Sequence, residues 1–137
     1  PALSQFARYT IDMMDSGLFD FIAHPDLFGN CYAQWDQAAA SCAKDICQAA
    51  ADLDVALEIN ALGIRKQTYK KADNPYPMYP WLPFWETAAE CGATVIINSD
   101  AHRPEDLQAR TSQAFSLMKQ CGLSHIDVHQ IGATHST

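Results

Sequence analysis

The sequence has no long apolar run, few cations and no Cys-x-x-Cys pair. No apolar stretch approaches the ~18 residues of a membrane span, and we find no signal peptide, internal repeat or low-complexity tract. Lys and Arg total 9 against 16 Asp and Glu, giving a net charge of −7. This balance disfavours a broad nucleic-acid or anionic-membrane surface, although a local basic pocket stays open. Five cysteines without a Cys-x-x-Cys motif indicate reduced thiols in a cytoplasmic protein.

The hydrophobic pattern predicts a single α/β domain over residues 1–137. Hydrophobic residues make up 48% of the chain and charged residues 18%, as in ordinary folded domains. We predict helices over 3–17, 35–51, 81–92 and 103–122, and strands over 18–24, 54–60, 93–99 and 125–129. Residues 61–80 contain three prolines, which predict a loop. Near-continuous apolar strands that alternate with helices indicate a parallel sheet.

Each of the three main predicted strands ends in polar side chains. In parallel α/β folds the chemistry lies at the carboxyl ends of the strands, so these side chains are the first candidates for a site. They are His24 with Asp26, Glu58 with Asn60, and Asp100 with His102.

Asp100 and His102 form the sharpest of these pairs. Two residues apart at a strand end, both side chains can point to the same side. Carboxylate and imidazole groups are suitable ligands for zinc, iron or manganese. The alternative is that Asp100 caps the next helix and His102 lies on the surface.

The other strand ends have comparable alternatives. His24 is either a metal ligand or a structural histidine, and Asp26 either bonds to His24 or caps the next element. Glu58 and Asn60 alternate with apolar residues and therefore face one side of their strand. Glu58 is either an acid beside a metal or a buried carboxylate held by hydrogen bonds.

Arg65 and Lys66 follow the second strand closely. A guanidinium group can hold a phosphate with two hydrogen bonds, and an ammonium group adds charge. Cations beside acidic strand ends suggest an anionic substrate, and the alternative is a solvated loop.

Four segments in this order resemble the PHP (polymerase and histidinol phosphatase) family, and most closely its histidinol-phosphatase branch. The resemblance runs from about Phe19 to Leu107. The segments are FIAHPDLF, LEINALGIRK, NPYP and NSDAHRPEDL.

The resemblance implies a distorted seven-stranded TIM-like (βα) barrel with two or three divalent metals (Zn, Fe or Mn). By position, His24, Asp100 and His102 match metal ligands of the family. Arg65 matches a phosphate contact. Three further polar residues are expected beside the ligands rather than bound to metal, namely Glu58, Asn60 and Asp26.

The chain also departs from the family pattern, because no histidine precedes His24. In the family, several ligands lie before the histidine that His24 matches. They are the opening His-x-His pair, the middle histidine and the bridging glutamate. A complete barrel of this kind needs about 250 residues, so we expect the C-terminal half of one. A half-barrel exposes strand edges and apolar surface, which predicts self-association or a missing N-terminal half.

The function implied by the resemblance is metal-dependent hydrolysis of a phosphate monoester, with L-histidinol phosphate of histidine biosynthesis as substrate. The chain alone would carry only part of the site. One alternative is another PHP phosphoesterase or a polymerase-associated exonuclease. A second alternative is a non-catalytic structural half-barrel.

Overall fold

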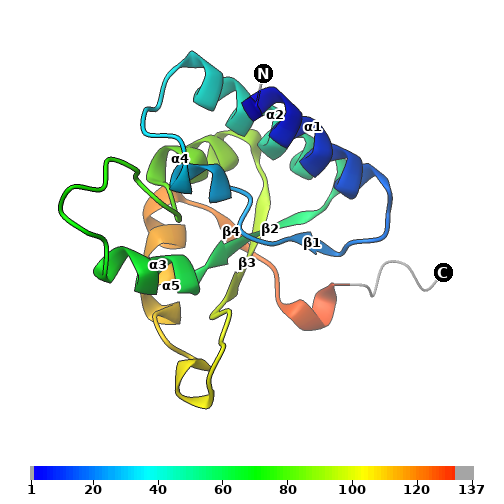
Figure 1. Ribbon diagram of the computed structural model, residues 1–137. Helices are drawn as coiled ribbons and strands as arrows, with labels where there is room; N and C mark the ends of the chain where they lie inside the picture. Colours follow the sequence, from blue (N-terminus) through cyan, green and yellow to red (C-terminus); the bar gives the residue numbers. More distant parts are fainter. Residues whose placement is uncertain (1, 132–137) are drawn as a thin grey trace.

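The computed structural model describes residues 2–131, which form an α/β fold around one parallel sheet (Figure 1). The strands are β1 (Phe21–Ile22), β2 (Ala56–Asn60), β3 (Thr94–Asn98) and β4 (Ser124–His125). The α-helices are α1 (Ala2–Asp15), α2 (Gln37–Leu53), α3 (Ala61–Thr68), α4 (Leu82–Cys91) and α5 (Thr111–Cys121). Short 3-10 turns lie at Leu27–Asn30, Pro104–Asp106 and Val128–Gln130.

The sheet has the order β1-β2-β3-β4, and every neighbouring pair is parallel. This confirms the predicted α/β class and parallel sheet. The longest pairing aligns β2 with β3, and it places Asn60 beside Asn98 at the carboxyl ends. The half-barrel remains a prediction.

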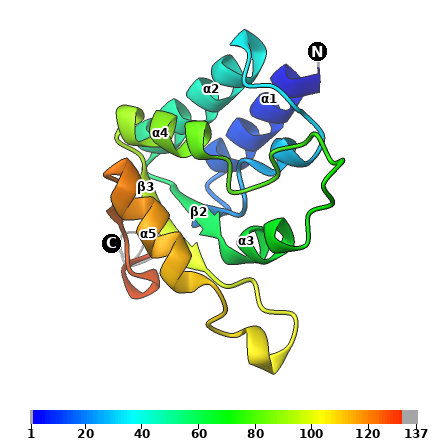
Figure 2. The same cartoon turned by 90° about the vertical axis from the view of Figure 1, so that its left-hand side faces the viewer.

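Four of the helices, α1, α2, α4 and α5, pack in a row against the sheet. Helix α1 packs on α2, α2 on α4, and α4 on α5, and Figures 1 and 2 show α1, α2 and α4 grouped together. Leu57 and Ile59 of β2 lie fully buried in the core shared with these helices. Burial of an aliphatic side chain of this size contributes about 1.5–3 kcal/mol, so the core fixes which face of β2 meets the helices. The alternate residues, Glu58 and Asn60, are left for the opposite face.

The predicted loop over 61–80 is wrong in its first part, because Ala61–Thr68 is helix α3. The Asn60 side chain caps this helix by accepting hydrogen bonds from the backbone N–H groups of Leu62 (2.9 Å) and Gly63 (3.4 Å). The prolines that predicted a loop begin only after α3 has ended. The cap therefore decides the local structure immediately after β2.

Two boundaries near the C-terminus also differ from the prediction. The predicted helix over 103–122 is a 3-10 turn at Pro104–Asp106 followed by α5 from Thr111, with Arg110 in the left-handed region (φ 65°) between them. The predicted strand over 125–129 is instead β4 at Ser124–His125 and a 3-10 turn over 128–130. Both differences lie outside the strand ends that carry the candidate site.

Candidate functional site

Glu58 lies at the centre of a polar network that joins the ends of three strands. Its side chain is only 2% exposed. Glu58 Oε2 accepts hydrogen bonds from the backbone N–H of His24 (2.9 Å) and from Asn60 Nδ2 (3.0 Å). Glu58 Oε1 accepts one from Asn98 Nδ2 (3.0 Å). The carboxylate therefore ties the chain after β1 and the end of β3 to β2.

Asn60 connects this network to the next candidate ligand. Asn60 Nδ2 also donates to Asp100 Oδ2 (2.9 Å), while its Oδ1 caps α3. Both ends of the amide are thus fixed, one toward carboxylates and one toward helix N–H groups. The predicted position of Glu58 and Asn60 on one side of β2 agrees with these contacts.

His24 and Asp100 both have positive backbone φ angles, which residues other than glycine rarely adopt. Their φ angles are 32° and 48°, and each residue lies just beyond the end of its strand. Such conformations cost on the order of 1–3 kcal/mol each and concentrate at functional sites. The network around Glu58 and Asn60 supplies the contacts that hold both residues in place.

His102 lies close to Asp100, as the two-residue spacing predicted. His102 Nδ1 is 3.0 Å from the Asp100 carbonyl oxygen and 3.7 Å from Asp100 Oδ1. The His102 side chain is 67% exposed, so its ring is accessible to a ligand. The alternative that placed His102 on the surface is confirmed by this exposure, whereas Asp100 does not cap the next turn, whose N-cap residue is Arg103.

Arg65 holds the chain that follows β3. Its Nη1 donates to the carbonyl oxygens of Ser99 (2.8 Å) and Ala109 (3.2 Å), and its Nη2 donates to that of Asp100 (3.0 Å). Arg65 Nε lies 3.8 Å from Asp106 Oδ1, and the side chain is only 13% exposed. The guanidinium group therefore fixes the loop that carries Asp100 and His102. The predicted phosphate contact would have to compete with these partners.

Lys66 and Tyr79 extend the site next to His24. Lys66 Nζ lies 3.3 Å from Tyr79 Oη, and the Tyr79 ring lies 5.7 Å from the His24 ring, centre to centre. Lys66 is exposed, whereas Tyr79 is buried. An ammonium group thus stands near the predicted ligands with donors left for an anion.

Asp26 does not have the role predicted from its position next to His24. It is buried, and its Oδ2 accepts hydrogen bonds from the Trp81 backbone N–H (2.7 Å) and from Trp85 Nε1 (2.9 Å). It makes no side-chain cap on the turn that follows it. Burial raises the pKa of Asp26 to about 7, against the opposing effect of these hydrogen bonds. Asp26 therefore anchors the start of α4 rather than bonding to His24 or capping its own turn.

The predicted metal ligands are only partly brought together. Within residues 2–131 no group of three or more His, Cys, Asp or Glu side chains is placed to hold a metal ion. Asp100 and His102 are neighbours, while His24 is linked to them through Glu58 and Asn60. Sequence reasoning missed Asn98, whose contact with Glu58 depends on the register of β3 against β2.

None of the described helices is long and apolar enough to cross a membrane. No protein-family model and no curated protein matches the chain. The resemblance to the PHP family therefore remains a prediction.

Proposed function

We propose that this chain is part of a cytoplasmic, metal-dependent phosphate monoester hydrolase of the PHP type, with L-histidinol phosphate as substrate. The proposal rests on the four sequence segments and on the position of their polar residues at the carboxyl ends of parallel strands. The chain would form about half of a TIM-like barrel, and an N-terminal half would supply the other part of the site.

One observation carries this proposal. Two of the three strand-end residues predicted as ligands, His24 and Asp100, are held at positive φ, and one hydrogen-bonded path through Glu58 and Asn60 connects them. Residues with strained backbones concentrate at functional sites, and here two of them lie at one sheet edge. Their joint fixation supports a role in binding.

The donor types suit a divalent metal, but the described residues do not form a complete metal site. A metal in such a site polarises phosphoryl oxygens and acidifies bound water. The contribution of this chain is to fix its donors: Glu58 positions His24, Asn60 positions Asp100, and Arg65 holds the backbone around Asp100.

Lys66 is the cation best placed to attract a phosphate group. Its ammonium group has one nearby hydroxyl partner, whereas the Nη atoms of Arg65 already bond to backbone carbonyls. A substrate phosphate beside His24 would gain a charge-assisted hydrogen bond from Lys66 without displacing structural contacts. Arg65 would act on the substrate mainly through the loop it holds.

The test measures bound metal and phosphatase activity together. The chain is incubated with zinc, manganese or iron(II), freed of excess metal and assayed for bound metal and for phosphate release from histidinol phosphate. Metal binding that depends on His102 supports the proposal, and His129→Ala is the matched control because His129 lies in the distant turn after β4. Equal metal binding by His102→Ala and His129→Ala would contradict it.

A non-catalytic structural half-barrel is the second candidate. The observation that favours it is the lack of a complete group of metal ligands among the described residues. Less than one metal per chain, together with no phosphate release after an N-terminal PHP half is added, would favour this second candidate. Phosphate release in the presence of both halves would exclude it.

A further inference from the structure

Tyr79 contacts two side chains that have different tasks in the proposed function, Lys66 for the phosphate group and His24 for a metal. Lys66 Nζ lies 3.3 Å from Tyr79 Oη and 5.6 Å from the centre of the Tyr79 ring. The His24 ring lies 5.7 Å from the same ring, centre to centre. One buried aromatic side chain therefore links the two groups.

The segment over residues 77–81, which we call the strap, is tied to the turn that follows β1. The backbone N–H of Met78 donates a hydrogen bond to the carbonyl oxygen of Gly29 (2.8 Å). The backbone N–H of Trp81 donates to Asp26 Oδ2 (2.7 Å). These two contacts flank the middle of the strap and fix its path beside the carboxyl end of β1.

Helix α3 also holds the strap. Gln67 Nε2 donates hydrogen bonds to the carbonyl oxygens of Pro77 (3.4 Å) and Pro80 (3.2 Å). A Cβ atom at Gly63 would overlap the Tyr79 ring, so the ring packs directly on the backbone of α3. The Tyr79 hydroxyl is therefore held in one position relative to the helix that carries Lys66.

The chemistry of the contact between Lys66 and Tyr79 fixes its direction. An ammonium group can only donate hydrogen bonds, so Lys66 donates and Tyr79 Oη accepts. The contact uses one of the three ammonium protons, and the others remain to bind an anion. A lysine side chain that is already held loses less rotamer freedom when it binds an anion than a free one does.

We propose that Tyr79 is a positioning residue, which holds the Lys66 ammonium group in place to bind a small oxyanion beside His24. Tyr79 is only 1% exposed, so it acts through Lys66 and does not itself touch the anion. This role rests on the proposed function, which assigns the substrate phosphate to Lys66. It also explains why Lys66 would be preferred over Lys70 and Lys71, which are exposed beyond the end of α3.

The probe is inorganic phosphate, added to the metal-free chain at constant pH while NMR follows the Cε signals of the lysines. We expect the Lys66 signal to shift to saturation, and those of Lys70 and Lys71 to shift less. Tyr79→Phe removes the hydroxyl and keeps the ring, so it should weaken phosphate binding about two- to tenfold. The matched control is Tyr69→Phe, at a side chain that is 85% exposed, and it should bind phosphate as the wild type does.

Relaxation of the same NMR signals gives a readout that needs neither phosphate nor a variant. In the wild type, the Lys66 Cε group should be more ordered on the ps–ns timescale than that of Lys70. In Tyr79→Phe, the Lys66 group should become as mobile as that of Lys70. Circular dichroism checks that the variant keeps its fold.

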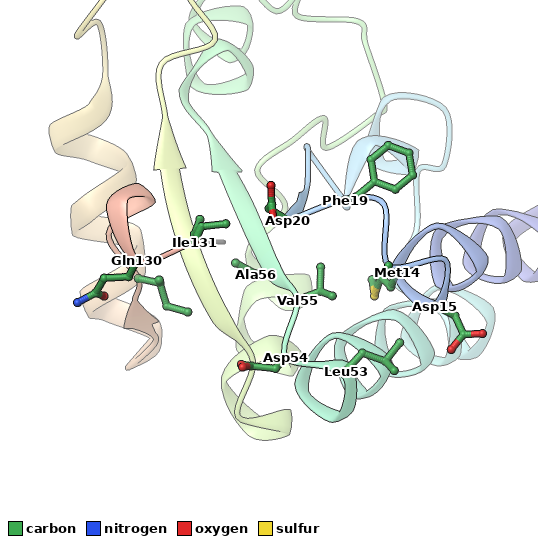
Figure 3. A pocket seen from close by; sticks show the side chains of 12 residues that line it. Met14, Asp15, Phe19, Asp20, Leu53, Asp54, Val55, Ala56, Gln130 and Ile131 are labelled. Atoms are coloured by element: carbon green, nitrogen blue, oxygen red, sulfur yellow. The ribbon is translucent and has the colours of Figure 1, made fainter. Parts of the chain in front are cut away.

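The hollow at the amino end of β2 supplies an internal reference for the titration. Its volume is about 460 Å³, and Figure 3 shows Val55 and Ala56 in its lining together with Asp15, Asp20 and Asp54. None of the described residues that line it is lysine or arginine. The amide signals of Val55 and Ala56 should therefore stay unchanged, and shifts there that saturate together with those of Lys66 would overturn the inference by showing non-specific binding.

The remaining outcomes separate this role of Tyr79 from the proposed function. A folded Tyr79→Phe variant that binds phosphate as tightly as the wild type would overturn the role of Tyr79 and leave the phosphate contact of Lys66 standing. A wild-type Lys66 side chain as mobile as that of Lys70 would do the same. A Lys66 shift no larger than that of Lys70 would refute the phosphate contact itself, and the role of Tyr79 with it.

Discussion

Replacing Glu58 by Gln tests whether the carboxylate holds the three strand ends together. In the wild type its two oxygens accept three N–H groups, from His24, Asn60 and Asn98. Glutamine keeps one accepting oxygen and places an NH₂ group against at least one of these donors. The arrangement with the smallest loss turns the NH₂ group toward Asn98, because only one donor faces Oε1.

The expected loss of stability follows from these three contacts. Two hydrogen bonds to a charged acceptor become hydrogen bonds to a neutral one, which costs about 1 kcal/mol each. The third becomes a donor facing a donor, which costs about 1–3 kcal/mol unless the partly exposed Asn98 amide turns. We therefore expect Glu58→Gln to lower the free energy of unfolding by about 2–5 kcal/mol, with the lower end reached if the Asn98 amide turns.

Urea denaturation measures this loss, with Glu90→Gln as the matched control. Glu90 is exposed on α4, so its replacement should change the free energy of unfolding by less than about 0.5 kcal/mol. A loss for Glu58→Gln no larger than that of Glu90→Gln would refute the central role of Glu58. An unchanged denaturant dependence shows that both variants unfold from comparably compact states.

Three further predictions concern the supports of the site. Asp26→Asn tests the raised pKa: the folded protein binds more protons than the unfolded chain between about pH 4 and pH 7, so wild-type stability should fall as pH rises through this window. Urea denaturation measures the free energy of unfolding at each pH. Its loss from about pH 5 to pH 8 should be about 3 kcal/mol larger for wild type than for Asp26→Asn. An equal pH dependence of the two proteins would contradict the raised pKa. Arg65→Lys should speed amide hydrogen exchange in the loop between β3 and α5, since an ammonium group cannot reach all three carbonyls. The control is Arg103→Lys at an exposed side chain, which should leave the exchange rate unchanged. Equal exchange rates in the two variants would refute this prediction. Gly63→Ala should lower the unfolding free energy by about 1–3 kcal/mol, because its Cβ would meet the Tyr79 ring and carbonyl oxygen, and an unchanged melting temperature would contradict it.

The parallel sheet could be predicted because β2 and β3 are nearly continuous apolar runs between turn residues. The polar residues that end these runs could also be predicted as neighbours, since parallel strands end at one edge of a sheet. Glu58, Asn60 and Asp100 do meet there. The Glu58–Asn60 contact follows from strand alternation, whereas the Asn60–Asp100 contact also needs β2 and β3 to be neighbours in the sheet.

Features set by contacts between distant segments could not be predicted. Asp26 bonds to Trp81, which lies 55 residues further along the chain, and no local pattern predicts that partner. Asn98 joins Glu58 only because the register pairs Asn60 with Asn98. Helix α3 was missed because the prolines after Thr68 were given more weight than the cap at Asn60.

Titration of the chain with Mn²⁺, followed by NMR of its histidine rings, shows whether a metal binds at the carboxyl ends of the strands. Manganese broadens the resonances of nuclei near its binding site, so each histidine reports its own distance from the metal. We expect that His102 broadens first, that His24 follows, and that the distant His129 is unaffected at the same concentrations. Equal broadening of all histidines, or broadening of His129 before His102, would contradict a metal site at the carboxyl ends of the strands.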